Sequence, residues 1–331
     1  MRHIFIVNPA AGKKTEQGRI ISRINEVCAR EGVNYQVHLT KGTDDARQKA
    51  LEECRKCPRE EVIRFYACGG DGTIGEVANG LAGYPNAQLA AIPCGTGNDF
   101  VKNFGPDSFF LDIAAQLKGF SHKIDATRVQ YRMAGSSRET LAVNLCSLGF
   151  DADVALNMSK FKSLPFVKGS LAYTLSIFYC LIKKVRNDFT VTLDDFPPVS
   201  GRFMLSAICS GFCYGGDYKA APGALVDDGE LDAVLVTAVP RRSVPKLVKH
   251  YQAGDHAALE GILTSCRVKH AHIRSQREVA INIDGECFPV FEADFQVLPG
   301  LLNVSLPDGI QTLDFPRHYG LKEPVFSERK E

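Results

Sequence analysis

The sequence Tyr66-Ala67-Cys68-Gly69-Gly70-Asp71-Gly72-Thr73 decides the fold of this chain, because it places three glycines and a carboxylate between a strand pattern and a helix pattern. Glycines let the backbone turn tightly and present bare N–H groups to an anion, and the helix that follows adds its positive N-terminal end. Asp71 would repel a phosphate unless a cation lay between them. The stretch therefore predicts a site for a nucleoside triphosphate held with magnesium.

Length and composition place the chain among globular proteins. With 331 residues it can bury two cores. Its 39 Lys and Arg nearly balance its 38 Asp and Glu, so no overall field recruits nucleic acid, and we expect no nucleic-acid partner. Eleven cysteines lie scattered in apolar runs, which favours reduced thiols in a cytoplasmic protein over a secreted disulfide scaffold.

No segment has the pattern of an export signal or a membrane span. The N-terminus lacks the length and the cleavage site of a signal peptide. The longest apolar segment, residues 171–182, is interrupted by polar side chains and is shorter than the roughly 20 residues that a spanning helix needs. We therefore expect a soluble chain without a transmembrane segment.

The first third of the chain alternates strand and helix patterns. Repeated βαβ order predicts a parallel sheet with helices on both faces, and ligands bind at the carboxyl ends of such strands. We assign residues 1–123 to this α/β nucleotide-binding domain. The predicted strands are residues 5–7, 35–39, 62–68 and 89–92, and the predicted helices are residues 20–28, 44–54 and 74–81.

From about residue 124 the pattern changes to short runs rich in β-branched and aromatic residues, separated by Gly, Pro and Asp turns. These runs predict a mainly antiparallel β-domain over residues 124–331, with helical insertions near residues 168–184 and 243–251. The predicted strands are residues 140–145, 189–193, 202–209, 231–236, 279–283 and 291–298.

Two further polar turns follow predicted strands of the first domain. Asn8-Pro9-Ala10-Ala11-Gly12-Lys13-Lys14 lacks the first glycine of a P-loop and has Lys14 where Ser or Thr would bind magnesium, so taken alone it is equally well an ordinary strand–helix turn. In Pro93-Cys94-Gly95-Thr96-Gly97-Asn98-Asp99-Phe100, Thr96 and Asn98 offer groups that bind phosphate oxygens or cap the next helix. Three such turns at one sheet edge predict a crevice for a phosphorylated ligand.

Gly70-x-Gly72-x-x-Gly75 also has the form of the dinucleotide fingerprint. Where an acidic residue should end the next strand and bind the ribose, the sequence is Ala91-Ile92-Pro93-Cys94. Asp71 inside the loop would in addition face the pyrophosphate. The sequence therefore does not favour a nicotinamide-dependent dehydrogenase.

Two Asp-Gly-Glu triplets stand in the second domain, at residues 228–230 and 284–286. An isolated Asp-Gly is usually a hairpin turn. Asp284, however, follows a predicted strand and precedes Cys287 and Phe288, and a carboxylate in such surroundings can act as a base. Cys54-x-x-Cys57 and His270-x-His272 lack further ligands at metal-binding spacing, so we assign no metal to them.

Residues 160–186 interleave basic and aromatic side chains. Such a helical surface suits an anionic membrane interface, and a core helix with solvated lysines at its ends explains the pattern equally well. The residues are Lys160, Lys162, Lys168, Lys183, Lys184 and Arg186 with Phe161, Phe166, Tyr173, Phe178 and Tyr179.

Taken together, these motifs closely resemble the diacylglycerol kinase catalytic-domain family, including its soluble bacterial lipid kinases. The resemblance rests on residues 7–12, 69–77 and 92–100 and on the two triplets, and so extends from residue 7 to about residue 286. It implies a phosphofructokinase-like nucleotide domain followed by a β-sandwich, with the active site between them. It further implies an ATP-dependent kinase that phosphorylates a lipid hydroxyl at a membrane surface, with diacylglycerol as the favoured acceptor and phosphatidic acid as the product.

The resemblance also implies roles for individual residues. Asp284 resembles the catalytic base, and Asp71 would act on ATP through Mg²⁺. A separate structural magnesium loop would combine the Asp228 carboxylate with backbone carbonyls of Leu225 and Glu230. The family usually has Asn where this chain has Gly75. Contacts with ATP are implied for Asn8, Pro9, Ala10, Ala11, Gly12, Thr40, Gly69, Gly70, Asp71, Gly72, Thr73, Ile74, Gly75, Glu76, Gly95, Thr96, Asn98 and Glu286.

Alternatives remain open on the sequence alone. The acceptor could be another lipid alcohol, such as a sphingoid base or a monoacylglycerol. An NAD kinase shares the Gly-Gly-Asp-Gly-Thr turn, although the turns at Asn8 and Thr96 fit lipid kinases. A catalytically silent regulator that binds lipid or nucleotide is the alternative from another class. The oligomeric state is not readable, and a homodimer is among the options.

Overall fold

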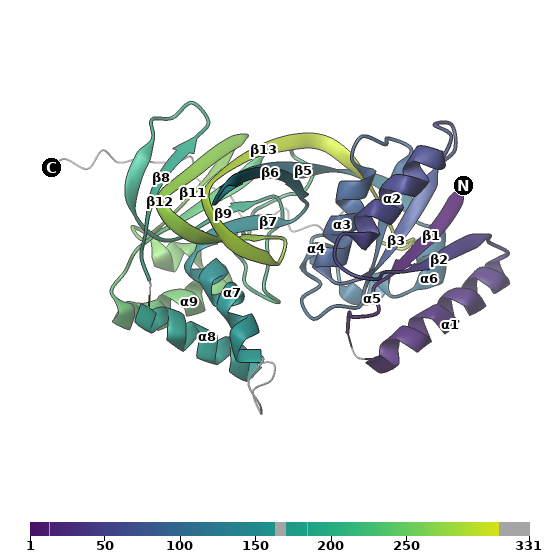
Figure 1. The fold of residues 1–331 in the computed structure, drawn as a ribbon, viewed down its shortest axis with the longest axis horizontal. Coiled ribbons are helices and arrows are strands. Elements are labelled where there is room, and N and C mark those ends of the chain that lie inside the picture. The colour runs from purple at the N-terminus through teal and green to yellow at the C-terminus, as the bar shows by residue number, and fades with distance from the viewer. Residues whose placement is uncertain (13, 163–169, 184, 311–331) are drawn as a thin grey trace.

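The computed structural model describes residues 1–310 except residues 13, 163–169 and 184. Two domains lie side by side, and the long strands β5 (Phe120–Met133) and β13 (Glu286–Leu306) extend from one to the other (Figure 1). The thirteen strands form one continuous hydrogen-bonded sheet. Within the described residues, no helix is long and apolar enough to cross a membrane.

The first domain is the predicted parallel sheet with helices on both faces. Its strands are β1 (Arg2–Val7), β2 (Tyr35–Leu39), β3 (Ile63–Gly69) and β4 (Ala87–Pro93), in the order β4-β3-β1-β2. Its helices are α1 (Lys14–Glu31), α2 (Asp45–Lys56), α3 (Asp71–Leu81), α4 (Asp99–Lys102), α5 (Asp107–Phe110) and α6 (Ile113–Leu117).

Alternation along β1 explains why both faces of this sheet are covered. Ile4 and Ile6 pack into the core beneath α2 and α3, whereas Phe5 and Val7 pack into a second core beneath α1 and α6. Side chains of opposite parity point to opposite faces of a strand, so an uninterrupted apolar strand requires a helical layer on each side. This arrangement leaves the carboxyl edge of the sheet as the place for polar turns.

The second domain is mainly antiparallel, as predicted. Its strands are β6 (Ser136–Ala142), β7 (Leu145–Gly149), β8 (Asn187–Leu193), β9 (Val199–Cys209), β10 (Leu231–Thr237), β11 (Leu263–Val268) and β12 (His270–Ile283). The helical elements are α7 (Phe150–Lys162), α8 (Ser170–Lys183), η1 (Arg241–Ser243), α9 (Val244–Ala253) and η2 (His256–Leu259). All eleven cysteines of the chain are reduced, and most are buried.

The chain returns to the first domain at its described C-terminal end. β5 and β13 pair antiparallel, and Val304 of β13 pairs with Leu89 of β4 in parallel. Ile124 of β5 and Leu302 of β13 lie in the core beneath α2 and α3. The division of the chain at residues 123 and 124 is retained as a proposal, to which the structure adds that the end of β13 packs with the first domain.

The observed elements differ from the predicted ones at several places. The predicted strand at residues 140–145 is two strands, β6 and β7. α3 begins at Asp71 rather than at Ile74, so the glycine turn forms the first turn of the helix. The sequence patterns did not predict α7, and they did not predict the strands β5 and β11.

Much of the predicted basic and aromatic surface lies outside the described residues. Lys168, Lys184 and Phe166 lie outside the described residues, and so do the side chains of Lys160, Lys162, Tyr173 and Phe178.

Candidate active site

The three predicted turns meet at the carboxyl edge of the first sheet. Backbone hydrogen bonds hold them in register: Asn8 N donates to Cys68 O at 2.9 Å, and Cys94 N donates to Gly69 O at 2.8 Å. The turn after β2 joins them, because Thr40 N donates to Val7 O at 2.9 Å. The structure therefore brings together segments that are up to 90 residues apart in the sequence.

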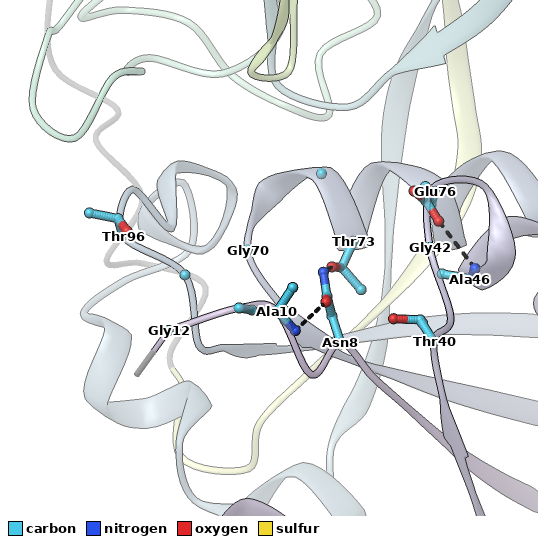
Figure 2. A pocket seen from close by; sticks show the side chains of 13 residues that line it. Asn8, Ala10, Gly12, Thr40, Gly42, Ala46, Gly70, Thr73, Glu76 and Thr96 are labelled. Atoms are coloured by element: carbon cyan, nitrogen blue, oxygen red, sulfur yellow. Dashed lines mark hydrogen bonds between the residues drawn. The ribbon is translucent and has the colours of Figure 1, made fainter. Parts of the chain in front are cut away.

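These turns surround a cavity of about 310 Å³ (Figure 2). Eleven of its lining residues belong to the predicted ATP site, namely Asn8, Ala10, Ala11, Gly12, Thr40, Gly70, Gly72, Thr73, Glu76, Gly95 and Thr96. Gly42 and Ala46 also line it, and the motifs did not indicate them. The sequence feature that could have indicated both residues is the polar, glycine-containing turn Gly42-Thr43-Asp44, which follows the second predicted strand.

Asn8 connects the first turn to α3. Its Nδ2 donates to Thr73 Oγ1 at 3.0 Å, and its Oδ1 accepts from Ala10 N at 2.9 Å (Figure 2). The side chain thus both orders its own turn and fixes that turn against the glycine-rich one.

Two of the glycines are required by close packing. A Cβ on Gly69 would lie 2.3 Å from Thr73 Oγ1, and a Cβ on Gly95 would lie 2.6 Å from Gly70 Cα. The turns at residues 69–73 and 93–100 therefore contact each other backbone to backbone. A Cβ on Gly75, in contrast, would meet no atom within 4 Å.

Some predicted ATP-binding residues do not line this cavity. Gly69 instead packs closely against the Thr73 side chain. Asn98 Oδ1 accepts from Gly95 N at 2.9 Å, and this hydrogen bond orders the turn that contains both residues. Ile74 is completely buried in the first-domain core. Its predicted contact with ATP cannot come from the side chain, and its N–H already donates to Gly70 O at 3.2 Å. Pro9, Asp71, Gly75 and Glu286 also lie outside the lining of this cavity.

Asp71 lies at the N-terminus of α3, beside a second carboxylate. Its Oδ1 accepts from Phe100 N at 2.9 Å. Burial raises the pKa of Asp71, and the neighbouring Asp99 charge adds to this, against the hydrogen bond from Phe100. Asp99 in turn accepts from Lys102 Nζ at 3.0 Å and from Gly216 N at 3.2 Å. The oxygens of these two adjacent carboxylates are ligands of the kind that a divalent cation prefers, and Lys102 offsets part of the charge of Asp99.

A second cavity of about 430 Å³ lies between the domains. Gly72 and Glu76 line both cavities, so the two adjoin at the first turns of α3. The lining comes from α3 and the beginning of α2 with the turn before it on one side, and from the β5–β6 and β12–β13 hairpins on the other. It comprises Thr43, Asp44, Arg47, Gly72, Gly75, Glu76, Asn79, Tyr131, Arg138, Glu139, Thr140, Leu141, Ile283, Asp284, Glu286 and Phe288.

Asp284 is at once a hairpin residue and a cavity residue. Asp284 and Gly285 have φ values of 47° and 96° and connect the paired residues Ile283 and Glu286, as in a two-residue β-turn with both central φ angles positive. The Asp284 side chain is directed to the break between β6 and β7. Its Oδ2 accepts from Val143 N at 2.6 Å, and its Oδ1 accepts from Asn144 N at 3.0 Å and Leu145 N at 2.9 Å.

The surroundings of Asp284 set its protonation. Burial raises the pKa of this carboxyl group to about 6, and the negative charge of Asp71 also raises it. The three N–H donors act in the opposite direction because they stabilise the carboxylate. The group is therefore mostly ionised at neutral pH yet can still accept a proton.

Two glutamates complete the junction of the cavities. Glu76 accepts from Asp44 N at 2.9 Å and from Ala46 N at 3.1 Å, which caps the start of α2. Glu286 follows the Asp284 turn, and burial raises its pKa, with further contributions from the charges of Glu76 and Asp44. Carboxylates from both domains therefore face one cavity.

The predicted magnesium loop around Asp228 lies elsewhere, before β10. Asp125 of β5 holds it by accepting from Gly229 N at 2.7 Å. Burial raises the pKa of Asp228, and the neighbouring Glu230 and Asp125 charges contribute, which suits a cation site. Arg267 already lies 3.7 Å from Asp228 Oδ2. Among the described residues, no group of three or more His, Cys, Asp or Glu side chains is arranged to hold a metal.

Comparison with known proteins agrees with this arrangement. The sequence profile of the diacylglycerol kinase catalytic domain matches residues 2–129, and that of the YegS C-terminal NAD kinase beta sandwich-like domain matches residues 144–306. A probable lipid kinase YegS-like of Pseudomonas aeruginosa (strain UCBPP-PA14) is 32% identical over 286 residues, covering 86% of this chain and 89% of that protein.

Two further relatives cover nearly the whole chain. A diacylglycerol kinase of Staphylococcus carnosus (strain TM300) is 24% identical over 312 residues, covering 94% of this chain and 96% of that protein. The crystal structure of a putative diacylglycerol kinase from Bacillus anthracis str. Sterne has a TM-score of 0.70 and 22% identity, covering 94% of this chain and 98% of that one. At this identity, the structural likeness shows the fold alone.

The parallel nucleotide-binding domain and the antiparallel domain beside it define a two-domain kinase. The chain belongs to the diacylglycerol kinase catalytic-domain family, and it is a lipid kinase.

Proposed function

We propose that this kinase uses ATP and magnesium to phosphorylate the hydroxyl group of a lipid, with diacylglycerol as the favoured acceptor and phosphatidic acid as the product. The observation that supports this most is the meeting of two cavities at Gly72 and Glu76. The first cavity has the glycine turns of a phosphate site, and the second contains Asp284. Donor and acceptor would therefore approach each other at the N-terminus of α3.

The nucleotide would bind with its phosphates at the first turn of α3, where bare N–H groups and the helix dipole favour negative charge. Asp71 and Asp99 offer the carboxylate oxygens that would hold magnesium, the ion that offsets phosphate charge in phosphoryl transfer. The loop of Leu225, Asp228 and Glu230 is proposed to hold a second, structural magnesium ion.

Asp284 would act as the base. The acceptor oxygen forms a bond to the γ-phosphorus, the bond from that phosphorus to the β,γ-bridging oxygen breaks, and the hydroxyl proton passes to Asp284. Oδ1 already accepts two N–H bonds, whereas Oδ2 accepts only the one from Val143. The remaining lone pair of Oδ2 is therefore the proton acceptor in this proposal.

Contact with a membrane is part of the proposal, because the acceptor is a lipid. Ile182 at the end of α8 is 71% exposed. Arg241 donates to Ile182 O at 2.8 Å, and Lys183 lies next to it in sequence. An apolar side chain among cations suits an anionic bilayer surface. Ile182→Glu should reduce sedimentation with phosphatidylglycerol vesicles, and unchanged sedimentation would place the membrane contact elsewhere.

The function is tested by incubating the purified protein with γ-labelled ATP, magnesium and separate lipid classes in mixed micelles, and then separating the products by chromatography. Label that comigrates with phosphatidic acid is the expected result. Label in another lipid alcohol would keep the lipid kinase and change the acceptor. NAD⁺ serves as a further acceptor, and labelled NADP⁺ would indicate the NAD kinase alternative. No labelled product beside an active control enzyme would contradict the proposal and favour a binding protein.

Two further expectations stay proposals. A cytoplasmic location rests on the eleven reduced thiols. Light scattering of the purified protein would determine whether it forms a homodimer.

A further inference from the structure

The cavity between the domains is rich in negative charge. Five carboxylate side chains line it, namely Asp44, Glu76, Glu139, Asp284 and Glu286, against two guanidinium groups, Arg47 and Arg138. Among the described side chains, the first cavity is lined by no Lys or Arg. A phosphoryl group that passes between these cavities carries negative charge into an acidic site, so it needs positive charge at the junction.

One of the two arginines, Arg47, already forms an ion pair with a carboxylate of this cavity. The Arg47 guanidinium group donates to both carboxylate oxygens of Asp44, from Nε to Oδ1 and from Nη2 to Oδ2, the latter at 3.0 Å. The hydrogen bond to Asp44 raises the pKa of Arg47. Within the part of the chain that the structure describes, the Arg138 side chain has no ion pair or hydrogen bond. Arg132 on the same hairpin differs, because it donates to Glu292 Oε2 at 2.9 Å.

Arg138 lies beside residues that border the base. It pairs with Tyr131 across the β5–β6 hairpin, and the Tyr131 ring packs against Phe288 at 4.9 Å between centroids. Burial raises the pKa of Tyr131; the charge of Arg138 lowers it and the charge of Glu286 raises it. The guanidinium is therefore close to the hairpin that carries Asp284.

Hydrogen bonds connect the β5–β6 hairpin to both sides of the cavity. Asn79 of α3 accepts from Leu141 N and donates to Leu141 O, each at 2.9 Å. Just beyond β6, the backbone at Val143 donates to Asp284. β6 is thus held at its C-terminal end to the nucleotide-side helix and to the base, and Arg138 lies three residues before Leu141 on this strand.

We propose that Arg138 is a catalytic residue whose guanidinium binds oxygens of the phosphoryl group while that group passes from ATP to the acceptor. The inference rests on the phosphoryl transfer proposed above. Charge is spread over the equatorial oxygens in such a transfer, and the fork of Arg donors can bind two of them at once. Arg138 neither takes a proton nor forms a covalent bond in this step.

The test compares Arg138→Ala and Arg138→Lys with Arg132→Ala, the matched control on the same hairpin. We expect Arg138→Ala to lower kcat by about 100-fold or more and to leave KM for ATP within about threefold. Arg138→Lys should recover only part of the rate because it lacks the planar fork. Added guanidinium ion should partly restore Arg138→Ala, which a purely structural role would not allow. Arg132→Ala should match the wild type.

A second measurement does not depend on the acceptor. ADP with magnesium and aluminium fluoride mimics the phosphoryl group in transfer, and it should bind Arg138→Ala at least tenfold more weakly than the wild type, whereas ADP alone should bind both equally. If the wild type phosphorylates no lipid but this difference persists, the proposed function fails and the role of Arg138 stands. A kcat within threefold of the wild type, a change confined to the KM of the lipid, or equal binding of the mimic would each overturn the role of Arg138.

Discussion

The side chain of Asn79 and the backbone of Leu141 form a reciprocal pair of hydrogen bonds across the two domains, with both distances at 2.9 Å. The amide of Asn79 takes the place of a neighbouring peptide group on the edge of β6. It also donates to Gly75 O at 2.8 Å, and its Oδ1 accepts from Thr140 Oγ1 at 3.1 Å. A single half-buried side chain therefore connects α3 of the nucleotide domain to the strand that carries Arg138.

Asn79→Ala is expected to destabilise the protein by about 2–3 kcal/mol, because it leaves the N–H and C=O of Leu141 without partners at a half-buried site. Chemical denaturation measures the change. Asn79→Asp is the matched control, since it keeps the acceptor for Leu141 N but loses the donor for Leu141 O, and it should show an intermediate loss. A loss below about 0.5 kcal/mol for Asn79→Ala would mean that these hydrogen bonds contribute little to the stability of the fold.

Gly75 and Gly95 should respond oppositely to a methyl group. Gly75→Ala adds a Cβ into open space within α3, and alanine is favoured over glycine in a helix by about 1 kcal/mol, so the melting temperature should rise or stay unchanged. Gly95→Ala places a Cβ 2.6 Å from Gly70 Cα and should lower both the melting temperature and the affinity for ATP. Calorimetry of the two variants checks the comparison, and equal melting temperatures would contradict the packing of the two turns.

Asp71→Asn should separate the charge of this residue from its hydrogen bond. The amide oxygen can still accept from Phe100 N, but the negative charge that would hold magnesium is lost. We expect a rise of at least tenfold in the magnesium concentration for half-maximal rate, with little change in the melting temperature. An unchanged magnesium dependence would remove Asp71 from the cation site.

The rate should fall in acid because of Asp284. Its pKa is raised to about 6, so the carboxylate is mostly ionised above that pH and mostly protonated below it. A protonated carboxyl group cannot accept the hydroxyl proton, so kcat should drop about tenfold per pH unit below the pKa. A profile of kcat between pH 5 and pH 8, with saturating ATP and lipid, is the measurement. A rate that stays constant down to pH 5 would exclude this carboxylate as the base.

The nucleotide side of the site was predictable because its signals are local. Each turn after a parallel strand carries its own glycines and polar residues, and the ends of such strands meet at one sheet edge. The turn containing Gly42 had the same signal and was missed only because it lacks a familiar motif. The motif includes Ile74, whose side chain is buried in the core, because a motif does not show which face of a helix points inward.

The acceptor side depends on pairings far apart in the sequence. The break between β6 and β7 follows from the bonds that Val143, Asn144 and Leu145 make to Asp284, about 140 residues away. An apolar run cannot indicate where its N–H groups will be taken by a distant side chain. For the same reason, the return of β13 to β4 was not predictable, since its partner strand lies in the other domain.

The central claim, that Asp284 accepts a proton from the hydroxyl of a lipid, is tested most directly by Asp284→Asn. The comparison is the initial rate of label transfer from ATP to lipid for this variant and the wild type at pH 7.5, with the affinity for ATP measured on the same samples. The account predicts that transfer is abolished while the affinity for ATP stays within about threefold. A transfer rate equal to that of the wild type would contradict it.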